Sequence, residues 1–477
     1  MKAKKIVIFI FGILAALAVI CAIFPRDGIT IGNIHFEFPS LHEVLEVDNE
    51  SSNDLAQTAD ELYEQQMKAM KATDDKQFKE FAENNPARFH MPNNDITYFD
   101  DLFEAMENAS TEPMRILHYG DSQLEGDRIS SDFRERLQTA FGGSGVGMVP
   151  AVQEVGAMTL IQTSSPKLPH YFAYNMGEHL RNSRYGIMSQ VAHLKGSAQF
   201  SFRSSSLDGV PHSKTFSKVT MVCSGKGKAT LHANGQSHEM TDASDGTDEM
   251  KFLTATLGAG SNKVSVSATG NMEIFGVMLD GTSGISLDNI PMRGCSGLVF
   301  TITARKTLEP FFKHNNVKLI ILQYGGNSVP YMKREKEIQG YKKGLIAQIN
   351  LLKEMSPNSK MLFIGPADMS TNVKGKKETY PQLEPTIKII EEVCSETGIA
   401  FWNLYDAMGG HNSMIKWVEA NLAGRDYLHF TREGASKVAD MLFNTYLMYY
   451  RFYCKREGKT PKDFGNTESG ETNKSEK

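Results

Sequence analysis

The sequence predicts an α/β domain that is interrupted by an all-β insertion and preceded by an apolar N-terminal segment. Three observations lead to this fold class. Strands followed by a turn and a helix begin at Met114 and recur after residue 300. Between these parts the chain is rich in Ser, Thr and Gly and has short alternating runs. Near the N-terminus, residues 6–24 carry no charge. Strand–turn–helix units indicate an α/β sheet, whereas strands without intervening helices indicate a β-sandwich.

The composition is that of a globular protein. The 477 residues include 51 basic and 56 acidic side chains, for a formal net charge of −5, with 40% hydrophobic residues. No long basic block is present to neutralise phosphates, so we expect no nucleic-acid partner. The five cysteines are scattered and none has C-x-x-C spacing, which argues against a disulfide scaffold and a structural zinc site.

The N-terminal segment predicts export. Lys2, Lys4 and Lys5 precede the uncharged stretch Ile6–Phe24, which as a helix would be about as long as a bilayer core, roughly 30 Å. We therefore expect residues 1–25 to form a signal anchor. A cleaved signal peptide would make the protein secreted, but the sequence around Cys21 offers a poor cleavage site, and Ile20 is unsuitable for a lipoprotein signal. All three alternatives place the remaining chain outside the cytoplasm, in the periplasm or beyond.

The chain then divides into four further parts. Residues 26–113 are polar and acidic and predict a helical stalk, with helices near residues 60–70 and 98–108. Residues 114–150 and 289–453 form the discontinuous α/β domain, residues 151–288 the inserted β-sandwich, and residues 454–477 a disordered tail. Within the α/β domain we expect strands at 115–119, 317–324, 360–364 and 399–404, and helices at 124–141, 298–313, 333–355, 384–397 and 431–450. In the insert, Asn234-Gly235 predicts a hairpin turn.

Ser122 is the first candidate catalytic residue. It follows a predicted strand in the tripeptide Gly120-Asp121-Ser122 and precedes a helix. Open α/β sheets place their sites at this carboxyl edge, and a nearby helix N-terminus favours developing negative charge. The tripeptide by itself is equally typical of an ordinary turn and cap.

A base and its orienting acceptor lie near the C-terminus. A serine nucleophile needs both, and Asp426 and His429 precede the last predicted helix at a spacing that lets them meet. Two glycine-containing loops, Gly294-Cys295-Ser296-Gly297 and Gly325-Gly326-Asn327, are candidate sources of donors to an oxyanion. Each piece alone also fits a surface loop or a helix entry.

Together the four pieces resemble the SGNH (GDSL-like) hydrolases. The blocks around Ser122, Gly297, Asn327 and Asp426-x-x-His429 occur in the order of that family, each at the expected strand end or loop. The resemblance covers roughly residues 114–150 and 289–453. It implies a flavodoxin-like three-layer domain and an acyl-serine intermediate, with no metal or organic cofactor.

The resemblance also implies a role for each residue. Ser122 would be the nucleophile and His429 the base and later the acid, with Asp426 orienting the imidazole. The N–H groups of Ser122 and Gly297 and the side chain of Asn327 would form the oxyanion hole.

The sequence departs from the family pattern in three places. Gln123 follows the first block, Ser328 stands where many members have Asp, and Leu298-Val299 replaces the usual Asp-Thr. Within the second block, the resemblance assigns the oxyanion donor to Gly297 rather than to Gly294.

The architecture predicts a glycan substrate. A β-sandwich inside such a domain resembles the peptidoglycan O-acetylesterases, whose insert is similar to a carbohydrate-binding module. We expect removal of O-acetyl groups from a cell-envelope or extracellular polysaccharide. Two alternatives stay open: O-acetyl transfer onto a glycan with a membrane acyltransferase partner, and a non-catalytic glycan-binding role. The aromatic residues of the insert are candidates for sugar stacking, although their alternation favours core packing: Tyr171, Phe172, Tyr174, Tyr185, Phe200 and Phe202.

Two other residue types have plainer interpretations. Cys295 is expected to be a small buried residue rather than a reactive thiol, and His118 a packed strand residue. Disulfides among Cys223, Cys295, Cys394 and Cys454 remain open for an exported chain.

Overall fold

The computed structural model describes residues 29–31, 34–36, 60–65, 67–68, 74–174 and 179–462. The expected anchor at residues 1–25 and residues 463–477 of the expected tail lie outside this part of the chain. The start of that tail was predicted wrongly at residue 454, because the last helix continues to Arg456. Within the described ranges, none of the helices has the length and apolarity needed to span a bilayer. A short antiparallel pair, β1 (Ile29–Ile31) and β2 (Ile34–Phe36), stands before the main body of the protein.

The centre of the protein is a six-stranded sheet with the order β13-β4-β14-β15-β18-β3. Five strands are parallel, and β3 pairs antiparallel with β18 at one edge. Numbered along the chain, the parallel strands have the order 2-1-3-4-5, which is the flavodoxin-like order that we expected. The strands are β3 (Phe89–His90), β4 (Met114–Gly120), β13 (Ile285–Pro291), β14 (Val317–Gln323), β15 (Lys360–Ile364) and β18 (Ala400–Trp402).

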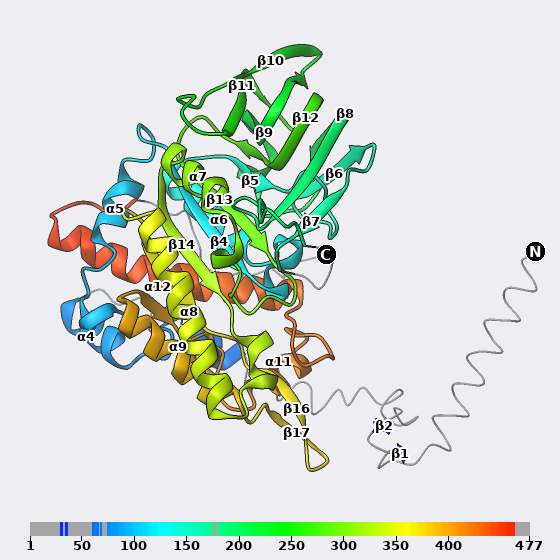
Figure 1. Ribbon diagram of the computed structural model, residues 1–477. Helices are drawn as coiled ribbons and strands as arrows, with labels where there is room; N and C mark the ends of the chain where they lie inside the picture. Colours follow the sequence, from blue (N-terminus) through cyan, green and yellow to red (C-terminus); the bar gives the residue numbers. More distant parts are fainter. Residues whose placement is uncertain are drawn as a thin grey trace, which may run out of the picture.

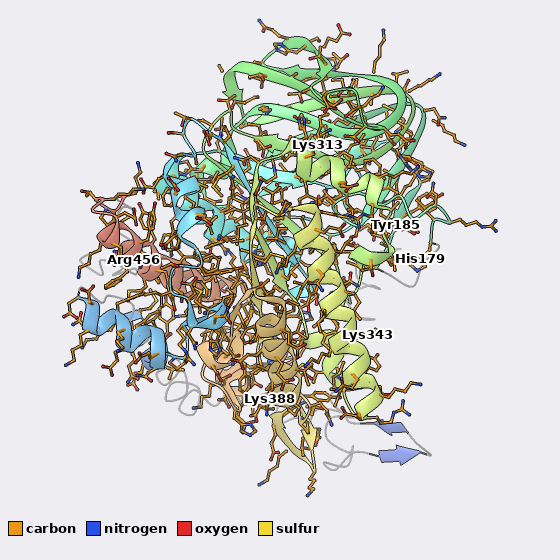
Figure 2. All side chains as sticks on the ribbon, turned by 60° about the vertical axis from the view of Figure 1, so that its left-hand side comes forward. His179, Tyr185, Lys313, Lys343, Lys388 and Arg456 are labelled. Atoms are coloured by element: carbon orange, nitrogen blue, oxygen red, sulfur yellow. The ribbon has the colours of Figure 1, made fainter. Side chains whose placement is uncertain are left out.

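Helices cover both faces of this sheet (Figure 1). Alternate strand residues enter two separate cores: Ile116 and Ile321 pack on one face, Leu117 and Leu322 on the other. The first face is covered by α4 (Asp75–Asn84), α5 (Asp100–Glu107), α6 (Ser130–Phe141), α11 (Ser413–Glu419) and α12 (Arg432–Arg456). The second is covered by α7 (Glu309–His314), α8 (Glu335–Met355) and α9 (Leu383–Thr397), while the short α10 (Leu404–Ala407) follows β18. Figure 2 shows the side chains on these helices, with the exposed Lys343 on α8 and Lys388 on α9.

Most predicted elements are confirmed within a few residues, but two helices differ. The one expected from residue 124 begins at Ser130, because Glu125, Gly126 and Asp127 leave helical geometry. The one expected over residues 298–313 is broken into η4 (Phe300–Ile302), η5 (Arg305–Thr307) and α7. Ala304 is extended there, and its N–H donates to the Ser183 carbonyl of the insert at 2.7 Å, which takes this residue out of the helix.

The predicted stalk is wrong for residues 75–113, which belong to the folded domain. The Phe78 ring stacks on Phe452 of α12 with centroids 3.9 Å apart, and Phe103 lies beside Tyr450 and Tyr453. β3 extends the central sheet through β18. The polar composition of this segment conceals apolar helix faces whose burial against α12 outweighs the charged residues around them.

The insert forms an antiparallel sheet of eight strands, and residues from both ends of its long strands, such as Val219 and Leu231, line one buried cluster. Its two longest strands, β9 and β12, pair along almost their whole length and bend together where Gly227 faces Gly270. A Cβ on Gly270 would lie 2.3 Å from the Lys226 carbonyl oxygen, so only glycine fits this close approach. The strands are β5 (Gly145–Val149), β6 (Leu160–Ser165), β7 (His170–Phe172), β8 (Gln190–Ser204), β9 (Phe216–Ala233), β10 (Gln236–Asp242), β11 (Met250–Ser261) and β12 (Lys263–Asp280).

Two details of the insert bear on the sequence analysis. The predicted turn at Asn234-Gly235 joins β9 to β10, with Ala233 opposite Gln236. The insert runs from Gly145 to Asp280 rather than from 151 to 288, because β5 pairs with β12 while β13 already belongs to the central sheet.

The insert is packed firmly against the α/β domain. Met188, Phe252 and Phe275 of the insert share one buried cluster with Phe300 and Phe311. At the same junction, the buried Arg115 of β4 forms ion pairs with Asp280 and Asp288, which end β12 and lie in β13. Breaking one partner of such a pair would leave an uncompensated buried charge, so the two parts are held in a defined relation.

Candidate active site

Ser122 and His429 meet at the carboxyl edge of the central sheet. Ser122 follows β4 after one residue, Asp121, and opens η2 (Ser122–Asp127), while His429 lies in the loop before α12. The Ser122 Oγ is 2.8 Å from the His429 Nε2, although 307 positions separate them in the chain. The other imidazole nitrogen, Nδ1, is 2.7 Å from the Asp426 Oδ2. The three predicted residues thus form a hydrogen-bonded relay in the geometry that a serine nucleophile requires.

The Asp426 carboxylate is fixed by its own loop. Its Oδ1 accepts the backbone N–H groups of Leu428 and His429, each at 3.1 Å. Partial burial acts to raise the pKa of Asp426, but hydrogen bonds from the His429 side chain and from these N–H groups outweigh it and lower the pKa. Asp426 therefore stays ionised at neutral pH and holds the Nδ1–H tautomer, which leaves Nε2 free to accept the serine proton.

Asn327 lies in the same cavity and is already engaged. Its side-chain nitrogen donates to the Asp121 Oδ2 at 3.1 Å and to the Cys295 carbonyl at 3.2 Å. These two bonds connect three predicted loops: the one carrying the nucleophile, the glycine block and the loop after β14. Both hydrogens of this amide are therefore engaged, while Asn327 lines the cavity beside Ser122.

Gly297 is not among the residues that line the Ser122 cavity. Its N–H donates to the Cys295 Sγ at 3.4 Å, and its φ of +86° is one that favours glycine. A Cβ there would lie 3.1 Å from the Tyr324 ring, which lines the Ser122 cavity. Gly294, by contrast, faces open space. The surroundings therefore favour Gly297 over Gly294 as the glycine next to the site, but its N–H is occupied by sulfur.

The cavity that holds these groups has a volume of about 210 Å³. Its walls are formed by the nucleophile loop, the loops after β14 and β15, and the loop of His429. A hairpin of β16 (Ser370–Val373) and β17 (Lys376–Thr379) borders the base loop, where the Ser370 N–H donates to the Tyr427 carbonyl at 3.1 Å. Tyr427 has a φ of +55°, an uncommon conformation for an aromatic residue, directly between Asp426 and His429.

Arg128 and Gln123 join the nucleophile loop to the base loop, and neither was predicted from the sequence as a functional residue. The Arg128 guanidinium donates to the carbonyls of Ser122 at 2.8 Å, Glu125 at 2.9 Å and Phe430 at 2.8 Å. The Gln123 amide donates to the Leu428 carbonyl at 2.6 Å. Gln123 was noted only as a departure from the family pattern, and Arg128 gave no signal, because side-chain bonds to distant carbonyls leave no periodicity.

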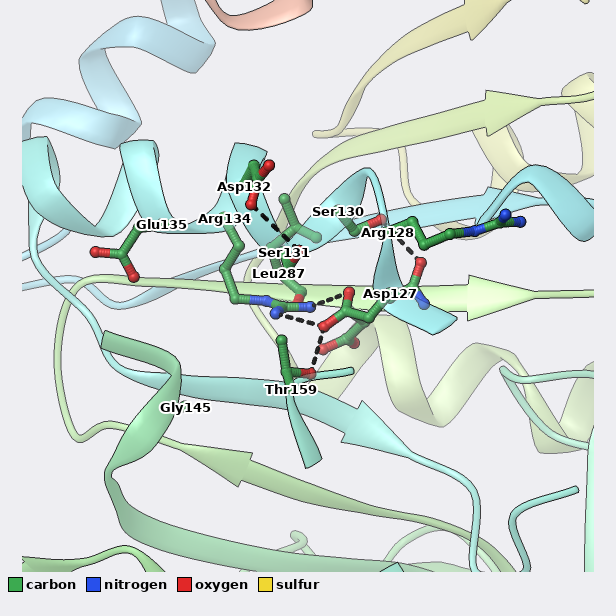
Figure 3. A network of polar contacts seen from close by, with 12 residues as sticks. Asp127, Arg128, Ser130, Ser131, Asp132, Arg134, Glu135, Gly145, Thr159 and Leu287 are labelled. Atoms are coloured by element: carbon green, nitrogen blue, oxygen red, sulfur yellow. Dashed lines mark hydrogen bonds and ion pairs between the residues drawn. The ribbon is translucent and has the colours of Figure 1, made fainter. Parts of the chain in front are cut away.

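A buried ion pair supports the other end of the nucleophile loop (Figure 3). Arg134 of α6 donates to both oxygens of Asp127, at 2.9 and 3.0 Å, and to the Leu287 carbonyl. The hydroxyl of Thr159, which begins the approach to β6 of the insert, donates to the Asp127 Oδ2 at 2.7 Å. The insert thereby contributes directly to holding the loop that carries Ser122.

Comparison with known proteins adds the fold family. No protein-family model and no curated protein matches the chain. Among solved structures, that of a peptidoglycan O-acetylesterase is similar over 74% of this chain and 96% of its own, with a TM-score of 0.61 and 20% identity. The chain shares the fold of that O-acetylesterase over most of its length. Two solved structures are less similar: the acetyl xylan esterase AlAXEase, with a TM-score of 0.27, and a putative GDSL-like lipase from Parabacteroides merdae ATCC 43184, with a TM-score of 0.28. They are 18% and 16% identical, covering 33% and 34% of this chain and 79% and 74% of their own.

The aromatic candidates of the insert and His118 are mostly packing residues. Phe172, Tyr185, Phe200 and Phe202 are buried in the insert or at its junction, which confirms core packing for them, while Tyr171 and Tyr174 are half-buried. His118 is fully buried between Gln323 and Ser130.

Cys223, Cys295, Cys394 and Cys454 are free and buried. Burial raises the pKa of Cys295 to about 11, so this thiol stays protonated. In the part of the chain that the structure describes, no group of three or more His, Cys, Asp or Glu side chains is placed to hold a metal ion.

Proposed function

We propose that the protein is a serine esterase that removes O-acetyl groups from a polysaccharide of the cell envelope or the extracellular space. The observation that carries this proposal is the relay from Ser122 through His429 to Asp426 at 2.8 and 2.7 Å. It is supported by the fold, which is similar to that of a peptidoglycan O-acetylesterase. A glycan ester is the substrate that this combination of fold and site favours.

In the first half of the reaction, the Ser122 Oγ attacks the acetyl carbonyl carbon while His429 Nε2 accepts its proton. The carbonyl oxygen becomes an oxyanion, which the Ser122 N–H stabilises; the Asn327 amide joins it by exchanging its bond to the Cys295 carbonyl for one to the oxyanion. Ser122 is the first residue of η2, where an N–H has no acceptor within its own turn. The tetrahedral intermediate then collapses: the bond to the sugar oxygen breaks, His429 protonates that oxygen, and acetyl-Ser122 remains.

In the second half, a water molecule replaces the sugar. His429 accepts a proton from the water as its oxygen attacks the acetyl carbon, and collapse of the second intermediate returns that proton to the Ser122 Oγ and releases acetate. Asp426 stabilises the imidazolium in both halves without taking the proton. If a sugar hydroxyl attacks in place of water, the same residues transfer the acetyl group to a glycan.

The test uses the full-length chain with 4-nitrophenyl acetate, with and without a chitooligosaccharide acceptor. We expect acetate release from the wild type and a loss of at least about 10³-fold in Ser122→Ala, because the covalent route disappears. Ser197→Ala, at an exposed position of the insert, is the matched control and should keep full activity. Acetyl groups on the acceptor would indicate a transferase, and a folded but inert wild type would overturn the proposal.

We further propose that the SGNH domain acts outside the cytoplasm on a membrane anchor. The support is the sequence itself, where three lysines precede the 19 uncharged residues Ile6–Phe24. Protease digestion of intact and lysed spheroplasts tests this, because only the cytoplasmic membrane then shields a domain. Domain cleavage only after lysis of the spheroplasts would contradict an exported domain.

A further inference from the structure

Tyr331 stands exposed at the rim of the catalytic cavity. Its side chain lines the same cavity as Ser122 and His429, yet 70% of the residue is accessible to solvent. No other large apolar or aromatic residue of the described chain is as exposed; Ile302 follows at 49%. A single exposed apolar residue is common on protein surfaces, but a protruding aromatic ring beside a nucleophile needs a reason.

The backbone turn that carries this ring is anchored. Tyr331 ends η6 (Gly326–Tyr331), the turn that also carries Asn327. Its neighbours Val329 and Met332 are buried, and the Met332 N–H donates to the Val329 carbonyl at 3.2 Å. Pro330 restricts the backbone directly before the ring. The turn is thus anchored on both sides while the Tyr331 side chain stays outside the core, so a ligand that uses the ring loses little conformational entropy on binding.

The size of the cavity determines which part of a substrate lies over this ring. At about 210 Å³, the cavity is smaller than the roughly 300–1,000 Å³ of pockets that enclose a drug-sized ligand. It accommodates the acetyl group and part of the unit that bears it, so the rest of a polymer must cross the rim. A pyranose ring has an apolar C–H face and a polar edge, and an amphipathic aromatic such as tyrosine matches both.

We propose that Tyr331 is a sugar-binding platform, which stacks on a pyranose ring of the substrate at the rim and thereby directs the esterase to glycan esters. This inference rests on the proposed function and specifies its substrate class. The apolar walls formed by Pro330, Met369 and Leu428 continue the platform into the cavity. The geometry points to recognition of the sugar chain in the SGNH domain itself, whatever the insert contributes.

The test compares a sugar ester with an ester whose alcohol has no ring. Acetate release is measured from acetylated xylan, from O-acetylated peptidoglycan and from ethyl acetate. For each protein we compare kcat/KM for the glycan that the wild type prefers with kcat/KM for ethyl acetate. In Tyr331→Ala we expect this ratio to fall about tenfold, chiefly because KM for the glycan rises. Tyr331→Phe keeps the ring and should stay within about twofold of the wild type. Ile302→Ala is the control for an exposed apolar residue away from the cavity.

Other outcomes separate the platform from the proposed function. An unchanged ratio in Tyr331→Ala overturns the platform and leaves the proposed function intact. A wild type that cleaves ethyl acetate but neither glycan overturns both the platform and the polysaccharide substrate, and leaves only the serine esterase chemistry. A Ser122-independent or absent activity on all three esters overturns the proposed function instead. Binding of xylohexaose and chitohexaose to Ser122→Ala gives a readout without catalysis. There, adding Tyr331→Ala should weaken the affinity for the better-bound sugar about tenfold, and equal affinity, or no binding of either sugar to Ser122→Ala, would count against the platform.

Discussion

Asn327 donates a hydrogen bond from its side-chain amide to the Oδ2 of Asp121, the residue directly before the nucleophile, across 3.1 Å. Asp121 is buried, and its Oδ1 accepts the Gln123 N–H at 3.0 Å. Burial raises the pKa of Asp121 to about 6, against the lowering effects of the Gln123 N–H, of His429 and of Asn327. A titrating carboxyl group thus lies between the nucleophile loop and the expected oxyanion donor.

The first prediction concerns pH and Asp121→Asn. Because the pKa of Asp121 is raised from 3.8 to about 6 in the folded protein, its contribution to stability is fully present below pH 3.8 and is lost as the pH rises through about 6. Relative to Asp121→Asn, the wild type should lose up to about 3 kcal/mol of unfolding free energy between pH 4 and pH 8. Urea unfolding of both proteins at several pH values measures this difference. Parallel curves for the two proteins would contradict the assignment.

The second prediction concerns Arg128, which holds three carbonyls with one planar group. Lysine cannot reproduce this fork, so Arg128→Lys should let the Ser122 loop and the His429 loop shift relative to each other. We expect kcat for 4-nitrophenyl acetate to fall about 10- to 100-fold with KM within about twofold, since Arg128 positions Ser122 without contacting the substrate. Arg451→Lys, on the exposed side of α12, is the matched control. A loss that appears only in KM would show that Arg128 contacts the substrate instead.

The third prediction tests whether residues 75–113 belong to the domain. Phe78 is buried and stacks on Phe452, so Phe78→Ala should lower the unfolding free energy by about 3–5 kcal/mol. Leu62→Ala, at a residue that is 36% exposed, should change it by less than about 1 kcal/mol. Chemical unfolding followed by tryptophan fluorescence reports the effect, because the buried Trp402 and Trp417 lie in the same core as Phe78. If Phe78→Ala were as mild as Leu62→Ala, a loosely attached segment would be the better description.

The sequence predicted the features that depend on local pattern. The continuous apolar run of β14 and the Gly-Asp-Ser turn after β4 are local, and their positions at the sheet edge follow from the rules of parallel sheets. The last helix was expected to begin at Thr431, and Thr431 caps α12, with its hydroxyl accepting the Gly434 N–H at 3.2 Å. The meeting of Ser122, His429 and Asp426 followed from the order of the family blocks rather than from spacing.

What the sequence could not predict depends on contacts between distant segments. The three carbonyl partners of Arg128 come from two loops about 300 positions apart. Ala304 is extended rather than helical, because its N–H donates to a carbonyl of the insert. The length and bending of β9 and β12 depend on the contact of Gly227 with Gly270. In the sequence, either glycine taken singly indicates the end of a strand. Tyr331 is unremarkable in the sequence because exposure is not visible there.

The last prediction concerns the hydrogen bond by which the insert supports the nucleophile loop. Thr159 is buried and donates to Asp127, whose carboxylate is also bound by Arg134 (Figure 3). Thr159→Val keeps the shape and removes the hydroxyl, so one carboxylate oxygen loses a donor in a buried place; we expect a loss of about 1–3 kcal/mol in stability. Because Asp127 ends η2, we also expect a several-fold lower kcat with 4-nitrophenyl acetate. Thr163→Val, at an exposed position of β6, controls for the substitution itself. Reduced stability with an unchanged kcat would mean that the insert stabilises the domain without positioning Ser122.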